Sequence, residues 1–348
     1  MSLPTLSVLI PNYNQGTYIK EAFEEILNQT WRPIEIIVVD DCSTDDSIEI
    51  IESCSKNEPL IRLIQHEKNK GSICTLQRLC EEAKGDYIHL TAPDDPVYPG
   101  LYKKSMELLT YYPQAGLCST LVECIDEKKR KLCIQPGSPF VSKVSCYLSP
   151  DEVLNSYLKF GNWFTASSAI WQREKFINLG AFSAVELSSY LDTFRFYQMA
   201  LNNGVCFIPE VLNAWRVTSG GWSAKSRYDP QVYWDLLNRA ERLMRTSLHD
   251  QFPEKFIENF IRRELATFGN VVFNKMDSEL EISLSFLSQA LPENNVADRV
   301  VIRFAQLLMR VQNIFLKVYL GFRLRRFNGI FLLRTIYHAK DCMKKLIK

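Results

Sequence analysis

The stretch that most constrains this chain is Ile34–Ser47, where an apolar run ends abruptly in carboxylates. Its first six residues are apolar and mostly β-branched except for Glu35, which is typical of a strand buried on both faces of a parallel sheet. Such a strand cannot carry two carboxylates in its middle, so Asp40 and Asp41 must stand at its carboxyl end. In open α/β sheets ligands bind at that edge. The alternative is that both acids only cap and solvate a loop.

The same order of short apolar strand, polar loop and amphipathic helix repeats along the first half of the chain. The expected strands are residues 6–10, 34–39, 60–64, 87–90 and 117–125, and the expected helices are 18–29, 43–56, 72–83 and 99–112. This alternation predicts an α/β fold with a mostly parallel sheet flanked by helices. The fourth strand also ends in a carboxylate pair, Asp94-Asp95.

Two domains follow from the way strand signals stop. Ser149-Pro150-Asp151-Glu152 has the residues of a helix start, and residues 188–202 form a second expected helix before short strands at 205–208 and 211–217. From residue 229 onward the pattern is only helical, with helices expected at 230–248, 253–274, 278–290 and 296–346. We therefore expect one domain over residues 1–225, divided into halves at 1–100 and 101–225, and a helical region over 226–348.

Composition places the chain among ordinary globular proteins, with 46% hydrophobic and 23% charged residues. The ten cysteines show no C-x-x-C pairs and no histidines at zinc-site spacing, so we interpret them as reduced thiols that mostly serve packing. The first ten residues lack the basic and long apolar segments of a signal peptide. These features together predict a cytoplasmic protein.

The last fifty residues, Arg299 to Lys348, are strongly basic. They hold twelve basic residues and one acid, a net charge of +11, so residues 1–298 carry −10 of the overall +1. Apolar residues recur along one helical face in this tail, but interspersed arginines and lysines argue against a transmembrane helix. An interfacial helix on an anionic membrane fits this pattern, and packing on the acidic remainder of the chain is the alternative. Nucleic-acid binding is a third option for the tail, but no known nucleic-acid-binding motif supports it.

The two carboxylate pairs at strand ends suggest how a ligand is held. A carboxylate accepts hydrogen bonds from a nucleobase N–H or from ribose hydroxyls, and a second one can hold a hard divalent cation that neutralises a diphosphate. The glycine-rich phosphate loops G-x-G-x-x-G and G-x-x-x-x-G-K-[ST] do not occur. A nucleotide would therefore be bound through its base, its ribose and a metal ion.

Several motifs of the chain resemble those of a known family, the family 2 glycosyltransferases. The resemblance covers about residues 5–225 and rests on the order and spacing of several motifs. The nucleotide half carries P-N-Y-N at 11–14, V-V-D-D-C-S-T-D-D-S at 38–47, N-K-G at 69–71 and G-D-Y-I-H-L-T-A-P-D-D at 85–95. The acceptor half carries S-A-I-W-Q-R-E-K-F-I-N-L-G-A-F at 168–182, Y-L-D-T-F at 190–194 and F-I-P-E-V-L-N-A-W-R at 207–216.

The resemblance implies a GT-A fold and a transferase that inverts configuration at the sugar. For the donor, it implies that Asp41 accepts the N3–H of uracil or an equivalent base. It also implies that Pro11, Asn12 and Tyr13 line the pocket for base and ribose. Asp94 corresponds to the last acid of the family's D-x-D motif and would bind the nucleotide's metal ion, manganese or magnesium.

Asp192 corresponds to the family's catalytic base, and the resemblance implies that it removes the acceptor's proton. The alternative is a helix N-terminal acid that is favoured only by the helix dipole. The family's usual Glu-Asp stands here as Leu191-Asp192, and its usual Arg-Asn after the N-K-G motif stands as Leu76-Gln77.

The D-x-D motif departs from the family pattern in a way that concerns the metal. It stands as Ala92-Pro93-Asp94, so its first acid is missing, and we expect Asp95 to compensate as a second metal ligand. Trp163, Trp215 and Trp222 are candidates for stacking on sugar rings, with core packing as the alternative for each. His89 lies within a strand and is expected to be packed and hydrogen bonded rather than catalytic.

We therefore expect a metal-dependent, inverting transferase that moves a sugar, with UDP-sugars favoured, to a hydroxyl of a glycan or lipid-linked glycan. The setting would be assembly of a bacterial surface polysaccharide at the inner face of the cytoplasmic membrane. A non-catalytic member that binds nucleotide-sugar or scaffolds an assembly complex is the main alternative. A nucleotidyltransferase is a lesser one, because residues 11–16 lack the basic residues of its phosphate loop.

Overall fold

The computed structural model describes residues 3–135, 141–218 and 229–275. The chain divides into two compact units, one of residues 1–221 with 250–252 and one of residues 222–249 with 253–348. The boundary expected near residue 225 lies outside the described residues, as do the helices expected at 278–290 and 296–346 and the whole basic tail. No helix in the described part of the chain is long and apolar enough to cross a membrane.

The first unit is built on one mixed sheet with the order β3-β2-β1-β4-β8-β5-β9-β7, to which β6 adds as a partner of β5. The strands are β1 Leu6–Asn12, β2 Glu35–Asp40, β3 Ile61–Gln65, β4 Tyr87–Leu90, β5 Leu117–Ile125, β6 Lys131–Gln135, β7 Cys146–Leu148, β8 Ile170–Gln172 and β9 Val205–Arg216. The α/β prediction is confirmed, and the first four strands are parallel, as their helical connections require.

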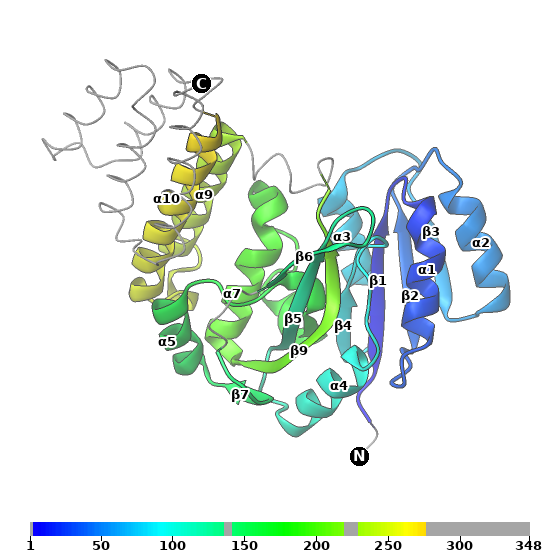
Figure 1. The fold of residues 1–348 in the computed structure, drawn as a ribbon, viewed down its shortest axis with the longest axis horizontal. Helices are drawn as coiled ribbons and strands as arrows, with labels where there is room; N and C mark the ends of the chain where they lie inside the picture. Colours follow the sequence, from blue (N-terminus) through cyan, green and yellow to red (C-terminus); the bar gives the residue numbers. More distant parts are fainter. Residues whose placement is uncertain (1–2, 136–140, 219–228, 276–348) are drawn as a thin grey trace, which may run out of the picture. The chain divides into compact units, whose positions relative to one another are not determined.

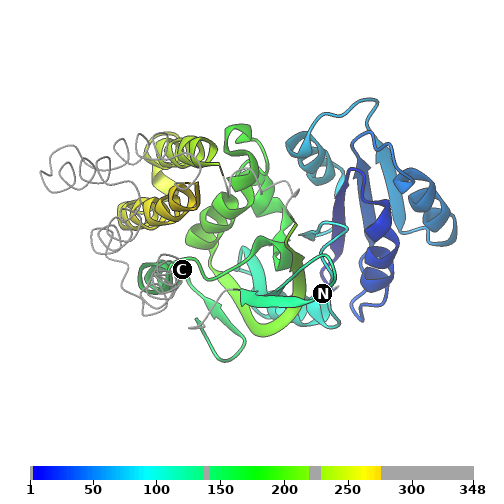
Figure 2. The ribbon, with the colours of Figure 1, turned by 45° about the horizontal axis from the view of Figure 1, so that its top comes forward.

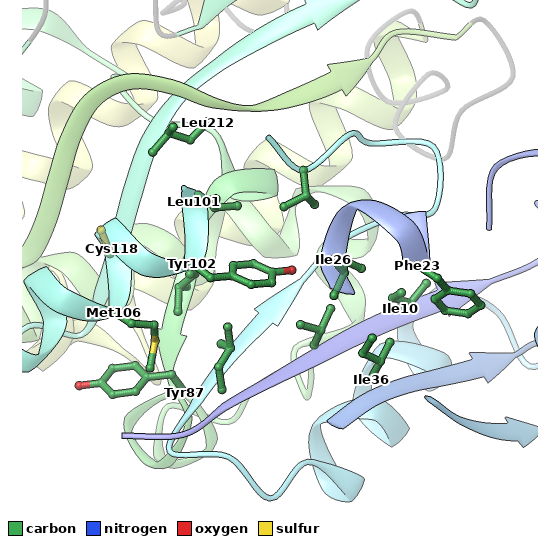
Figure 3. Close-up of a cluster of buried hydrophobic side chains, with 14 of the residues drawn as sticks. Ile10, Phe23, Ile26, Ile36, Tyr87, Leu101, Tyr102, Met106, Cys118 and Leu212 are labelled. Atoms are coloured by element: carbon green, nitrogen blue, oxygen red, sulfur yellow. The ribbon is translucent and has the colours of Figure 1, made fainter. Parts of the chain in front are cut away.

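The helices of the nucleotide half cover both faces of β1 and β2 (Figures 1 and 2). They are α1 Gly16–Leu27, α2 Ser47–Asn57 and α3 Ser72–Glu82, while α4 Leu101–Tyr111 begins the acceptor half and lies against β5 and β9. Alternate residues of β1 pack against α1, α2 and α4 in one core cluster, and α3 covers the other face. Figure 3 shows Phe23 and Ile26 of α1 beside Ile10 and Ile36 of the sheet. Both faces of these strands are buried, which explains their unbroken apolar runs.

Three short strands of the sheet, β6, β7 and β8, are absent from the sequence-based prediction. Strand β8, only three residues long, inserts antiparallel between β4 and β5. Because β8 is antiparallel to both neighbours, β5 runs in the same direction as β4. Strand β9 is parallel to β5 and so has that direction too. The two strands expected at 205–208 and 211–217 are one strand, β9, whose register against β5 shifts at Thr120 and Leu121.

The acceptor half adds helices α5 Pro150–Phe160, α6 Arg173–Asn178 and α7 Leu191–Asn203 and a 3₁₀ turn, η1, at Ala166–Ser168. The helix start predicted at Ser149 is confirmed as a capping box, in which the Ser149 hydroxyl and the Glu152 carboxylate satisfy each other's backbone amides. Trp163 is 1% exposed and packs edge-on against Phe196 and Phe207, so core packing holds for this tryptophan. Trp222 lies outside the described residues.

The second unit contains two amphipathic helices, α9 Pro230–Arg245 and α10 Glu254–Lys275, which confirm the helices expected at 230–248 and 253–274. They pack on each other, and Asp229 caps α9 by accepting hydrogen bonds from the amides of Gln231 and Val232. Leu236, Leu237 and Ala240 of α9 are buried.

His89 joins β4 to the acceptor half and is fully buried. Its Nε2 lies 3.0 Å from the carbonyl oxygen of Ser167, and its Nδ1 lies 3.0 Å from the hydroxyl of Tyr102. A carbonyl only accepts, so Nε2 carries a proton; because burial lowers the pKa of His89 and favours the neutral ring, Nδ1 accepts from the hydroxyl of Tyr102. The imidazole is therefore neutral in the fold, and the expectation of a packed, hydrogen-bonded histidine is confirmed.

We expect His89 to make the protein unstable in mild acid. Burial lowers the pKa of His89 from 6.5 to about 4, so the unfolded chain binds a proton that the folded chain excludes. The contribution is complete above pH 6.5 and is lost as the pH falls toward 4, which amounts to about 2–3 kcal/mol at pH 4.5. Urea unfolding at pH 7 and pH 4.5 measures this loss.

The matched control for this prediction is His89→Gln. It should be less stable than wild type at pH 7, because its shorter reach loses at least one of the two hydrogen bonds. Its stability should nevertheless fall less between pH 7 and pH 4.5, and equal falls in the two proteins would contradict the prediction.

Candidate functional site

The predicted site residues follow strands that end at one edge of the sheet. Strands β1, β2 and β4 are parallel, and β9 has the same direction as β4 through β8 and β5. The carboxyl edge therefore collects Asn12 from β1, Asp41 after β2, Asp94 after β4 and Arg216 from β9. Both carboxylate pairs therefore follow strands that end at this edge, and β1 lies between β2 and β4.

Asp41 is held by three donors from the chain that follows β3. Its Oδ1 accepts hydrogen bonds from Nδ1 of His66 and from the amide of Lys70, each at 2.8 Å, and its Oδ2 accepts from the amide of Gly71 at 2.8 Å. Burial raises the pKa of Asp41, but these three hydrogen bonds outweigh it and lower the pKa below its usual value. Asp41 is therefore an ionised acceptor at neutral pH.

Asp40 stabilises the fold and is not available to a ligand at the sheet edge. Its carboxylate is fully buried and accepts from Nδ2 of Asn12 at 2.7 Å and from the amide of Ser43 at 2.9 Å. The loops after β1 and β2 are joined further on, where Asn14 Oδ1 accepts from the amide of Thr44 at 2.7 Å. The two acids of the pair thus have different tasks, and Asp40 fixes the loop from which Asp41 projects.

The three residues predicted to line the base pocket differ in exposure. Asn12 is 1% exposed and its amide donates to Asp40, so its side chain is committed to the loop. Pro11 is half-buried, and Tyr13 is 49% exposed. Pro11 and Tyr13 therefore keep apolar surface that a ligand can contact, while Asn12 supports them.

Asp94 and Asp95 follow β4 and are tied to the end of β9. Asp95 is buried, and its Oδ1 accepts from the amide of Arg216 at 2.8 Å. Arg216 is 4% exposed, and its Nε donates to the carbonyl oxygen of Asp94 at 3.0 Å. Burial raises the pKa of Asp94, and burial together with the neighbouring Asp94 charge raises that of Asp95 well above its usual value.

These two carboxylates fit a hard divalent cation by chemistry and by charge. Magnesium and manganese sites of nucleotide enzymes use one or two carboxylates together with substrate phosphates. A cation there would stabilise the ionised form of both carboxylates, which burial disfavours at each and which the charge of Asp94 also disfavours at Asp95. Within residues 3–135, 141–218 and 229–275 no cluster of three or more metal-ligating side chains forms, so a nucleotide would have to complete the coordination.

Asp192 lies in the first turn of α7 and at the same end of the unit. Helix α7 ends at Asn203, next to the start of β9, and its thirteen residues span about 20 Å, so its first turn lies toward the carboxyl edge. Its Oδ1 accepts from the amide of Thr193 at 2.5 Å. Burial raises the pKa of Asp192, an effect that the bond from Thr193 only partly opposes. A carboxylate of raised pKa is a stronger general base.

Two residues at this edge carry contacts that the sequence did not assign to them. His66 follows β3 and fills one position on Asp41, and Arg216 ends β9 and binds both carboxylate-bearing residues after β4. Arg216 also stacks over the ring of Tyr18, with its guanidinium carbon 4.9 Å from the ring centroid. The pattern that identified Asp41, a polar residue at the end of an apolar strand, also applies to His66 and Arg216 and could have identified them.

The arrangement combines an ionised acceptor and an acidic pair along one sheet edge with a separate, half-buried carboxylate in the first turn of α7. The first can recognise an N–H of a base, the second can hold a cation with a phosphate, and the third can take a proton from a hydroxyl. These are the components of a group transfer from a nucleotide to an alcohol.

Residues 7–163 match the family model described as glycosyl transferase family 2. The glycosyltransferase GlyG of Streptococcus pneumoniae is 30% identical over an alignment of 236 residues, and the match covers 62% of this chain and 71% of GlyG. The uncharacterized glycosyltransferase YibD of Escherichia coli is 40% identical over 103 residues, 30% of each chain. A third relative, TuaG of Bacillus subtilis, is described as a candidate teichuronic acid biosynthesis glycosyltransferase. It is 31% identical over 106 residues, 30% of this chain and 42% of its own.

Among solved structures, residues 1–349 of S. aureus TarS in complex with UDP-GlcNAc match with a TM-score of 0.59. The match covers 92% of this chain and 91% of that one at 17% sequence identity. The corresponding complex with UDP gives a TM-score of 0.52 over 87% of this chain and 91% of that one, also at 17% identity. At these identities the likeness concerns the fold, which is of the GT-A type.

Proposed function

Since the chain belongs to glycosyltransferase family 2, we propose that it transfers a sugar from a nucleotide-sugar donor to a hydroxyl acceptor with inversion at the anomeric carbon. The observation that carries the proposal is the set of carboxylates at one sheet edge, with Asp41 ionised and Asp192 of raised pKa. The TarS structures, solved with UDP-GlcNAc and UDP, support a nucleotide-sugar as the donor class.

In this mechanism Asp41 accepts a hydrogen bond from the base, and Pro11 and Tyr13 contact base and ribose. Asp94, with Asp95 beside it, would hold a divalent cation, which would neutralise charge on the diphosphate. Asp192 accepts the proton of the acceptor hydroxyl, whose oxygen forms a bond to the anomeric carbon from the face opposite the nucleotide. The bond from that carbon to the diphosphate oxygen breaks, and its electron pair leaves with the diphosphate.

A panel of nucleotide-sugars tests both donor binding and the metal. Wild-type protein should be stabilised by UDP-sugars more strongly with manganese than without it, since a ligand at a hundred times its Kd adds about 2.7 kcal/mol. Asp94→Asn should be stabilised by UDP-sugars without metal as wild type is, but manganese should add no further stabilisation, because the amide cannot replace a charged ligand. Thermal unfolding with and without manganese measures this.

Asp151→Asn is the matched control for that panel. Asp151 is exposed at the start of α5, which follows β7 at the opposite edge of the sheet, so its variant should respond as wild type. An unchanged manganese increment in Asp94→Asn would place the metal elsewhere. Hydrolysis or transfer of the donor separates an enzyme from a non-catalytic binding protein, which would show stabilisation without turnover.

We further propose that the enzyme builds a surface polysaccharide at the cytoplasmic face of the membrane, on a lipid-linked or glycan acceptor. The description of TuaG supports polysaccharide assembly, and the +11 tail supports attachment to an anionic surface. The lesser alternative, a nucleotidyltransferase, is disfavoured by family membership and by the lack of Lys and Arg in residues 11–16.

Deleting residues 299–348 should release the protein from anionic vesicles and leave nucleotide binding intact. Each basic residue near an anionic surface contributes about 1 kcal/mol, and apolar burial adds a part that salt does not screen. High salt should therefore weaken co-sedimentation of the full chain only in part, and neutral vesicles should bind it less. Absence of vesicle binding at every salt concentration would favour a tail that packs on the acidic remainder of the chain.

A further inference from the structure

The hydrogen bonds to Asp41 leave it little capacity for a ligand. A carboxylate offers about two acceptor positions on each oxygen. Oδ1 already accepts from His66 Nδ1 and from the Lys70 amide, and Oδ2 accepts from the Gly71 amide. Counting the donors that the described residues supply, one position is left, and it is on Oδ2.

From this count we propose that His66 is a specificity-determining residue, which restricts the donor's base to one with a single imino N–H, that is, uracil or thymine. The inference rests on the proposed function, because it assumes that Asp41 reads the base. Uracil and thymine present one N–H between two carbonyl groups, and that N–H matches the single open position on Oδ2.

Guanine does not match this arrangement. Its edge presents two adjacent donors, N1–H and the exocyclic amino group, which pair best with both oxygens of a free carboxylate. With Oδ1 filled by His66 and Lys70, one guanine donor would be desolvated without an acceptor, a cost equivalent to about tenfold or more in Kd. Cytosine fits poorly for a different reason, because its ring nitrogen N3 would turn a lone pair toward the carboxylate.

His66 is the replaceable member of the three donors, because the other two are backbone amides. Its side chain is 7% exposed, and its own amide donates to the carbonyl oxygen of Asp40 at 2.9 Å, so its place after β3 is fixed by the backbone. Asp41 is ionised and can only accept, so Nδ1 of His66 carries a proton. Removing the imidazole therefore opens a second acceptor position, on Oδ1.

The test compares the Kd of UDP, CDP and GDP for wild type, His66→Ala and His66→Asn by calorimetry with manganese. Wild type should bind UDP about tenfold or more tightly than GDP or CDP. In His66→Ala the Kd of GDP should exceed that of UDP by only about threefold or less. His66→Asn places an amide nitrogen near the position of Nδ1 and should keep the wild-type ratio.

The ratio of the two Kd values is the informative readout, because a variant that merely loosens the loop weakens the binding of all three nucleotides alike. Equal affinities of wild type for UDP and GDP overturn the inference without any variant, which keeps the test valid should His66→Ala fail to fold. An unchanged ratio in a folded His66→Ala also overturns it. If wild type transfers sugar from a GDP-sugar, the inference fails and the proposed function stands, whereas binding of no nucleotide contradicts both.

Discussion

Replacing Asp41 by asparagine is expected to weaken UDP binding by about ten- to a hundredfold. The carboxylate accepts from the side chain of His66 and from two backbone amides, and it is proposed to accept from the base as well. Asparagine has one oxygen and an amide group that itself donates, so at least one of the buried donors would face another donor. The variant therefore loses the charged acceptor and the order of the loop around it.

Calorimetry with UDP measures this effect, and Asp151→Asn at the opposite sheet edge provides a carboxylate-to-amide control. The melting temperature of Asp41→Asn should also fall, since an unpaired buried donor costs about 1–3 kcal/mol. Wild-type affinity for UDP in a folded Asp41→Asn would move the base site away from the end of β2.

The second large effect is expected at Asp192. Asp192→Asn should fold and bind UDP-sugar as wild type does, yet lose transfer by about a hundred- to ten-thousandfold, the usual contribution of a general base. In wild type the rate should rise with pH as Asp192 ionises, above the usual range of an aspartate because burial raises its pKa. That rise should be absent from the residual activity of the variant.

Steady-state kinetics with a competent acceptor separates the base from a helix-end acid that only satisfies the dipole of α7. In the latter case kcat would stay within a few-fold of wild type, while the free energy of unfolding would fall by about 0.3–1 kcal/mol. Asp192→Glu is a useful companion, because it keeps the charge and moves the oxygens, so it should recover only part of the lost rate.

The apolar run before Asp40 was enough to place a buried strand and a polar edge, because that pattern is set locally by burial on both faces of the sheet. The sequence could not tell that Asp40 binds Asn12 and Ser43 while Asp41 binds the chain after β3. That division depends on which loops the sheet order brings together.

Strand β8 was missed for a related reason. Three residues with polar neighbours give too little periodicity to identify a strand, and the direction of β8 is decided by its partners β4 and β5, which lie far away in sequence. His89 was interpreted correctly because a histidine inside an apolar strand is most simply satisfied by neighbours. Those neighbours, Tyr102 and Ser167, could be identified only from the fold.

The link between Arg216 and the acids after β4 bears on attempts to engineer new specificities. Exchanging acceptor halves between relatives treats the two halves as independent modules. Here the last residue of β9 donates its amide to Asp95 and its side chain to the carbonyl of Asp94, so the acceptor half builds part of the donor half's acidic loop. A chimera joined near residue 100 would have to bring in a matching arginine, or it would exchange the acceptor site at the expense of the donor site.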